Sequence, residues 1–282
     1  MGVGIVTDST SMLPASVAAE HGIVVVPMSI AIGDEQFSEF EIDSAALIAA
    51  LGGKPAVSTS RPAPAALATA YAELAASGCT EIVSLHLSGT MSGTVESAQL
   101  AARDADVPVT VVDSRGVGAC VGYAALAAAK AVAAGATAAQ VATAAMDQAD
   151  GAKTFIYVDT LEHLRRGGRV GPVGALVGSA LAVKPLLEIL DGRVVARERV
   201  RTRSRALTRL RETAVDLAQG RQVQICVSHL ANREIADDIA AGLAEELAVE
   251  LDGRAVDRWD LGAVLGAHVG PGTIAVCVAP RP

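Results

Sequence analysis

Residues 82–94 read IVSLHLSGTMSGT, from Ile82 to Thr94. The stretch begins with the apolar pattern of a strand, continues through a loop made almost only of Ser, Thr and Gly, and then resumes with helical apolar spacing. The first turn of a helix leaves backbone N–H groups without partners, and Gly89 and Gly93 let a ligand approach the backbone closely. The stretch therefore predicts an anion-binding turn. Hydroxyl side chains that simply cap the helix remain an alternative.

Around this stretch, the first half of the chain alternates apolar, β-branched runs with helical patterns. Strands are predicted over residues 3–6, 23–30, 80–87 and 107–112, with helices near 14–20, 43–51 and 62–77 and from about 117 onward. This alternation indicates a mostly parallel sheet flanked by helices. Ligands of such sheets bind beyond the carboxyl ends of the strands, so we expect the polar loops 7–11, 88–94 and 113–115 to converge on one site.

The second half of the chain has a different pattern. It predicts a strand at 154–158, a short helix within 159–169, a hairpin over 186–200, helices near 204–217 and 233–247, strands at 222–227 and 273–278, and a loop at 266–272. The dipeptide Asp191-Gly192 is a strong hairpin-turn signal. We expect an α+β domain with a mixed sheet over residues 153–282, an α/β domain over 1–152, and a ligand between them.

Composition excludes several functional classes. The chain of 282 residues has a formal net charge of −8 and only 2% aromatic residues, so it offers no basic surface or stacking rings for nucleic acid. Its 4 cysteines lack metal-ligand spacing and are typical of reduced core thiols, which favours a cytoplasmic protein without a metal. The sequence shows no targeting signal and no membrane-length apolar run.

A series of short motifs along nearly the whole chain resembles the DegV family. The motifs occur in the family's order: Thr7-Asp-Ser-Thr10, Val26-Pro27, Ser58-Thr-Ser-Arg-Pro62, Leu87 to Thr94, Asp113-Ser114, Leu161 to Arg169, Val183-Lys-Pro-Leu186, Val200-Arg-Thr202 and Gly266 to Gly272. The resemblance implies a two-domain α/β protein that binds a long-chain fatty acid in a buried apolar tunnel. It also implies that the carboxylate is presented to a separate fatty acid kinase and that the protein itself is not an enzyme.

The resemblance assigns roles to individual residues. It implies that Thr59, Ser92 and His268 bind the carboxylate, with chemically suitable hydroxyl and imidazole donors. The loop residues expected to support them are Ser60, Arg61, Gly93, Thr94, Asp8 and Ser9. Arg61 and Ala63 depart from the residues that the family often has, Gln and Ser. Arg61 therefore either adds a charge to the head-group site or faces solvent.

Arg201 and Arg169 are the candidates for contact with the kinase. Arg201 precedes a predicted helix, where a cation gains nothing from the helix dipole. Arg169 follows the C-terminus of a predicted helix, and its position fits a structural role and a partner-binding role equally well. The expected partners are a long-chain fatty acid and the kinase, with at most transient membrane contact. No cofactor is expected besides the bound fatty acid, and no nucleic acid.

Two other functional classes remain open. A small-molecule hydrolase or phosphoryl-transfer enzyme could use the hydroxyl loops, but Gly89-Thr-Met-Ser92-Gly93 misses the Gly-x-Ser-x-Gly spacing by one residue, and no P-loop is present. An interaction protein with a purely regulatory role would need no enclosed apolar cavity. His86 lies inside a predicted strand and is interpreted as a hydrogen-bonded core histidine.

Overall fold

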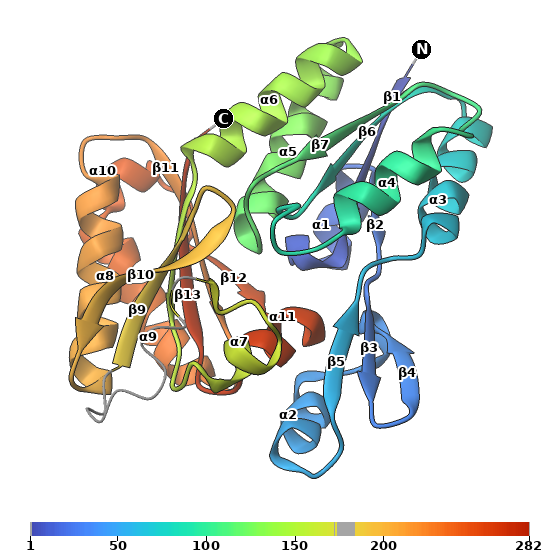
Figure 1. Ribbon diagram of the computed structural model, residues 1–282. Helices are drawn as coiled ribbons and strands as arrows, with labels where there is room; N and C mark the ends of the chain where they lie inside the picture. The colour runs from blue at the N-terminus through green and yellow to red at the C-terminus, as the bar shows by residue number, and fades with distance from the viewer. Residues whose placement is uncertain (1, 172, 174–183, 282) are drawn as a thin grey trace.

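The computed structural model of the protein describes residues 2–171, 173 and 184–281. A four-stranded parallel sheet, a six-stranded mixed sheet and a small three-stranded sheet form the molecule (Figure 1). The predicted mixed α/β class is therefore confirmed. Val183, which begins one of the sequence motifs, lies outside the described ranges, and within them no helix has the length and apolar character needed to cross a bilayer.

The parallel sheet has the strand order β2-β1-β6-β7. Its strands are β1 (Gly2–Asp8), β2 (Ile23–Val26), β6 (Cys79–His86) and β7 (Val109–Asp113). Its helices are α1 (Ala15–Glu20), α3 (Pro64–Ala76), α4 (Thr94–Ala102), α5 (Ala119–Ala133) and α6 (Ala138–Gly151). Successive side chains of a strand point to opposite faces, so Val6 packs with α3 and α4 whereas Ile5 packs with α5 and α6. Helices on both faces explain the continuous apolar runs of these strands.

The mixed sheet has the order β10-β9-β8-β13-β11-β12. Its strands are β8 (Lys153–Tyr157), β9 (Lys184–Leu190), β10 (Arg193–Val200), β11 (Val223–His229), β12 (Asp257–Asp260) and β13 (Ile274–Pro280). The helices of this half are α7 (Glu162–Arg166), α8 (Arg203–Ala218), α9 (Arg233–Glu246) and α10 (Ala248–Leu251), of which α8, α9 and α10 cover one face of the sheet. Asp191 and Gly192 both have positive φ, 49° and 75°, as the predicted hairpin turn requires. We retain residue 152 as the proposed domain boundary, because it lies between α6 and β8.

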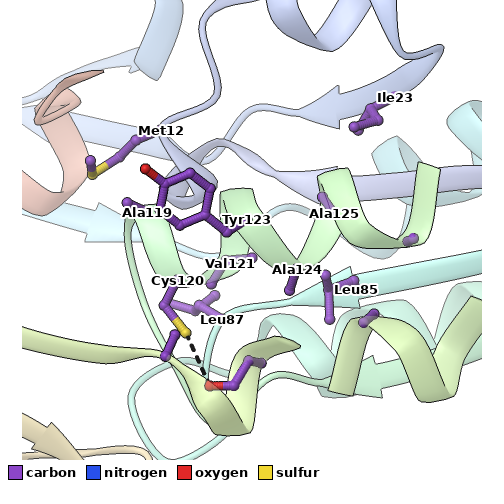
Figure 2. Packing of buried hydrophobic residues seen from close by; sticks show 14 of the residues in the cluster. Met12, Ile23, Leu85, Leu87, Ala119, Cys120, Val121, Tyr123, Ala124 and Ala125 are labelled. Carbon is purple, nitrogen blue, oxygen red and sulfur yellow. Dashed lines mark hydrogen bonds between the residues drawn. The ribbon is translucent and has the colours of Figure 1, made fainter. Parts of the chain in front are cut away.

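One apolar core joins the two large sheets. Figure 2 shows its α5 side, where Cys120, Val121 and Ala124 lie near Leu87 and Leu85 of the parallel-sheet half and Tyr123 lies near Met12. The same cluster continues into the mixed sheet through buried Cys226 and other residues. The α5 helix is therefore buried on several sides, which explains why its sequence is apolar almost throughout.

The three-stranded sheet was not predicted. It has the order β4-β3-β5 and belongs to an insert made of β3 (Ser29–Ile32), β4 (Glu35–Ser38), a 3-10 helix (Glu39–Glu41), α2 (Ser44–Gly52) and β5 (Val57–Ser60). The single strand predicted at 23–30 is wrong, because β2 and β3 belong to different sheets and Pro27, which has no N–H to donate, lies between them. In Figure 1 the insert forms a lobe beside the rest of the N-terminal half.

The loop predicted at 266–272 is also wrong in its first part, because α11 (Ala263–Val269) extends into it. Gly266 lies inside this helix and allows close packing, since a Cβ atom there would lie 2.6 Å from Leu47 Cδ2. Only Gly270 and Gly272 have positive φ values, 77° and 87°, which require a turn residue such as glycine. The last residues of the motif therefore form the predicted turn, whereas His268 lies on a helix.

The three polar loops converge at the carboxyl edge of the parallel sheet, as predicted. The Asp8 carboxylate accepts a hydrogen bond from Leu87 N at 3.1 Å, and the Asp113 carboxylate accepts one from Gly89 N at 3.1 Å. Ser114 N also donates to His86 O at 3.0 Å. These bonds tie the loops after β1, β6 and β7 to one another and so form one continuous surface.

We predict that Gly122→Ala weakens the packing of α5 against its neighbours. A Cβ atom at Gly122 would lie 2.6 Å from Ser11 O and 2.7 Å from a ring carbon of Trp259. Overpacking of this kind should lower the free energy of unfolding, measured by urea denaturation, by about 1–3 kcal/mol. Gly52→Ala in α2 is the control, because no atom lies within 4 Å of its Cβ position. Equal stability of the two variants would contradict this account.

Candidate functional site

The central pocket lies where the carboxyl edge of the parallel sheet, the insert and one face of the mixed sheet meet. It contains about 690 Å³ of space not filled by protein atoms, a volume that includes its open mouth. Most of its wall is apolar. The apolar lining residues are Met28, Leu87, Met91, Val117, Ile156, Leu164, Leu187, Ile189, Val194, Val264, Leu265 and Val269. Such a wall suits an extended hydrocarbon chain.

Thr59 and His268 lie together in the pocket wall. Thr59 comes from β5 of the insert and His268 from the C-terminal end of α11, and the Thr59 Oγ1 to His268 Nε2 distance is 2.8 Å. Burial, with a smaller contribution from the positive charge of Arg169, lowers the pKa of His268 to about 4. The imidazole is therefore neutral at pH 7.

The tautomer of His268 follows from its surroundings. Its Nδ1 atom is buried and has no hydrogen-bond partner among the described residues, and it packs against Gly167. A buried N–H without an acceptor is rarer in proteins than an unused lone pair, so we assign the ring proton to Nε2. Nε2 then donates to Thr59 Oγ1, which leaves the Thr59 hydroxyl proton free to donate to a ligand.

Ser92 and its loop also face the pocket. Ser92 is 9% exposed, and its Oγ lies 2.8 Å from Thr94 Oγ1. The N-cap residue of α4 is Gly93, which forms no side-chain cap bond, while the hydroxyls of Ser88 and Thr90 donate to the Gly192 carbonyl. The capping alternative for this loop is therefore not what the structure shows. Thr94 is buried beside Ser92 and does not line the central pocket.

Arg61 and Ser60 line the same part of the pocket. The Arg61 guanidinium donates to Gly93 O at 3.1 Å and to Glu96 Oε2 at 2.8 Å. A Cβ atom at Gly93 would lie 2.0 Å from Arg61 Nη1, so this contact needs a glycine. Arg61 therefore lines the pocket with a partly exposed side chain, and its charge is paired with the exposed Glu96 carboxylate.

The two candidate kinase-contact arginines lie in different places. Arg169 lines the pocket beside Thr59 and His268, and its guanidinium donates to the carbonyls of Met91 and Gly167 at 2.9 and 2.7 Å. A second hollow shares these three residues with the central pocket and is also lined by His163 and Arg166. Arg201 is exposed after β10 and is not a lining residue.

Asp8 and Ser9 lie behind the pocket wall. Asp8 accepts bonds from Thr10 Oγ1 at 2.5 Å and from His86 Nδ1 at 3.0 Å, and His86 Nε2 in turn lies 2.8 Å from Ser84 Oγ. This Ser-His-Asp arrangement resembles a hydrolytic triad, but all three side chains are fully buried and none lines the pocket. His86 is the hydrogen-bonded core histidine that the sequence indicated.

Sequence reasoning missed several wall residues. Thr10 was predicted only as part of the polar loop 7–11 and was given no role of its own. The apolar lining from β8, β9 and β10, such as Ile156, Leu187 and Val194, has no local signal, because one face of any half-buried strand looks the same. Within the described residues, no cluster of His, Cys, Asp and Glu is arranged to hold a metal ion.

We predict that His268 makes stability depend on pH. Its pKa in the folded chain, about 4, lies below the ordinary value of 6.5, so the unfolded chain binds the proton more strongly. The stabilisation that neutral His268 contributes to the fold is therefore complete above pH 6.5 and is lost as the pH falls toward 4. Urea unfolding at a series of pH values should show the stability gap between wild type and His268→Gln narrowing by up to about 3 kcal/mol over this window. A stability difference between wild type and His268→Gln that does not change with pH would contradict the lowered pKa of His268.

Comparisons with known proteins agree with this arrangement. The family model described as "Uncharacterised protein, DegV family" matches residues 2–281. A DegV domain-containing protein of Streptomyces coelicolor is 48% identical over 281 residues, covering 99% of each chain.

Two solved structures extend the similarity to the whole fold. One, of a DegV family protein from Thermus thermophilus described as binding fatty acid, has a TM-score of 0.89 at 32% identity and covers 100% of both chains. The other, of DegV from Bacillus subtilis, described as a fatty acid binding protein, has a TM-score of 0.89 at 29% identity and also covers 100% of both chains. The chain therefore belongs to the DegV family.

Proposed function

We propose that this protein binds a long-chain fatty acid in the central pocket and presents its carboxylate to a separate fatty acid kinase, without catalysing a reaction itself. The observation that carries the proposal is a pocket with an apolar wall and a polar group of Thr59, Ser92 and His268. The two relatives whose structures are described as binding fatty acid share its fold over the full chain. Among the described residues that line the pocket, two are arginines and none is Asp or Glu, which suits an anionic head group.

The energetics favour retention of the ligand by its chain. Burial of roughly 15 methylenes at about 0.8 kcal/mol each contributes on the order of 12 kcal/mol. This free energy corresponds to a dissociation constant of about 1 nM before the cost of ordering the ligand is subtracted. Each polar contact with the head group adds about 1–3 kcal/mol. The polar residues therefore serve mainly to orient the carboxylate, and the hollow beside Thr59, Arg169 and His268 gives a second protein access to it.

A carrier role agrees better with the polar residues than a hydrolase role does. A serine nucleophile needs a base within hydrogen-bond reach. Ser92 instead pairs with the Thr94 hydroxyl, while His268 pairs with Thr59. Ser84 has a histidine partner, but it is fully buried away from the pocket.

Arg201 is the proposed contact with the kinase. It is exposed and forms no ion pair or hydrogen bond with the described part of the chain, whereas its neighbour Arg203 donates to Asn232 Oδ1 at 2.7 Å. An unpaired guanidinium keeps its planar donor fork for a carboxylate of a partner. Arg201 is therefore the freer member of the arginine pair.

We predict that the protein purified without added lipid carries about one fatty acid per chain. An apolar ligand enclosed in this pocket should dissociate slowly and should stabilise the fold, so delipidation should lower the melting temperature. The measurement is mass spectrometry of an organic-solvent extract, quantified against protein. Far less than one equivalent, together with no stabilisation by added palmitate or oleate, would overturn the fatty acid assignment.

We predict that Arg201→Ala leaves fatty acid content and melting temperature unchanged but reduces phosphorylation of the bound fatty acid by the cognate kinase. The loss should be largest at limiting carrier concentration and partly recovered at higher concentration, because only docking is weakened. Arg103→Ala is the control, since Arg103 is also exposed but lies at the end of α4. Unchanged kinase turnover would remove Arg201 from the interface, and loss of lipid would place it in the ligand site.

A further inference from the structure

The insert holds α11 at both of its ends. At the C-terminal end, Thr59 is hydrogen-bonded to His268. At the N-terminal end, the carboxylate of Glu39 accepts a bond from Val264 N at 2.8 Å. The 3-10 helix that carries Glu39 and the strand that carries Thr59 belong to the same insert. The position of α11 is therefore set by two polar contacts with one unit.

Glu39 joins three segments of the pocket wall, although it does not line the pocket itself. Its second carboxylate oxygen accepts a hydrogen bond from the Ser9 hydroxyl, and its own N–H donates to Met28 O at 2.9 Å. Ser9 Oγ in turn accepts a bond from Met28 N at 2.9 Å. Met28 and Val264, two of the residues that Glu39 contacts, line the pocket, and so does Thr10, which directly follows Ser9 in the chain.

A buried carboxyl group at this place needs a reason. Glu39 is 5% exposed, and desolvation raises its pKa, although the bonds from Ser9 and Val264 act in the opposite direction. Buried acids rarely stabilise a fold more than an apolar residue of similar size would. A helix as short as α11, with seven residues, also has little stability of its own, so tertiary anchors decide where its side chains lie.

We propose that Glu39 is a positioning residue for the head-group site. By fixing the N-terminus of α11 to the loop after β1, it holds His268 at hydrogen-bond distance from Thr59 and so keeps the Thr59 proton available to the ligand. This inference rests on the proposed function only for its effect on fatty acid. The effect on the His268 and Thr59 pair is a property of the protein without ligand.

Two kinds of variant test the role. Glu39→Ala removes the carboxylate, and Glu39→Gln retains an acceptor for Val264 N. Gly262→Ala leaves Glu39 in the chain but displaces it, because a Cβ atom at Gly262 would lie 2.2 Å from Glu39 Oε1 while the backbone φ of −60° suits alanine. Glu41→Ala is the matched control on the same 3-10 helix, since the exposed Glu41 carboxylate caps this helix by accepting a bond from Ser38 N and, within the described residues, contacts neither α11 nor the loop after β1.

The first measurement is the ¹⁵N NMR signal of the His268 imidazole in delipidated protein. Glu39→Ala and Gly262→Ala should both move the Nε2 signal away from its wild-type position or broaden it. Glu39→Gln should restore most of it, and Glu41→Ala should leave it unchanged. A merely structural role predicts a lower melting temperature with a wild-type His268 signal, and that result would overturn the proposal.

The second measurement is the rate at which a fluorescent fatty acid leaves the protein for phosphatidylcholine vesicles. Loss of one charge-assisted hydrogen bond behind the site should speed release about tenfold in Glu39→Ala and Gly262→Ala. If Glu39→Ala does not fold, the release rate of Gly262→Ala alone tests the role of Glu39. Wild-type release rates in both folded variants would count against Glu39. Failure of the wild-type protein to bind fatty acid would instead refute the proposed function, and the His268 signal would still test Glu39.

Discussion

The burial of α5 between the two large sheets sets the geometry of the rest of the molecule. Its alanine-rich sequence lets both halves approach closely, and Gly122 leaves room for Trp259 of β12. Tyr123 adds a direct link, because its hydroxyl donates to Asp257 at 2.7 Å and its ring centroid lies 5.0 Å from that of Trp259. With this separation fixed, the carboxyl edge of the parallel sheet faces the mixed sheet across a gap, and the gap is the pocket.

The hydroxyl groups around this pocket differ in whether their proton is already donated to another protein group. In the loop after β1, the Ser9 and Thr10 hydroxyls donate to Glu39 and Asp8, which lie behind the wall. Thr10 therefore presents only acceptor lone pairs to the pocket. Thr59, by contrast, accepts a bond from neutral His268 and retains a proton to donate. This asymmetry favours an anion beside Thr59 over one beside Thr10, and the Arg169 guanidinium in the same part of the wall acts in the same direction.

Local sequence patterns correctly predicted those helices, strands and turns whose structure depends mainly on residues nearby in the chain. The parallel strands, their helices and the hairpin at Asp191-Gly192 were predicted, because periodicity and turn chemistry are local properties. The helix of the insert was predicted at 43–51, but its sheet was missed because β3, β4 and β5 are strands of four residues with weak patterns. Their pairing with one another, more than their sequence, makes them strands. The extension of α11 into 266–272 was missed because Gly266 serves packing against Leu47 rather than a turn.

By itself, the sequence determined the mixed α/β class, the convergence of three polar loops and, through its motifs, the DegV family. Only the tertiary structure placed the Thr59 hydroxyl against His268, 209 residues away in the chain, and Glu39 against Val264, 225 residues away. The tertiary structure also placed Arg169, which the sequence suggested as a candidate for contact with the kinase, in the pocket wall. The physical reason is that hydrogen bonding and desolvation act between atoms a few ångströms apart. Residue types along the chain do not specify such distances until the packing around α5 has set the separation of the two halves.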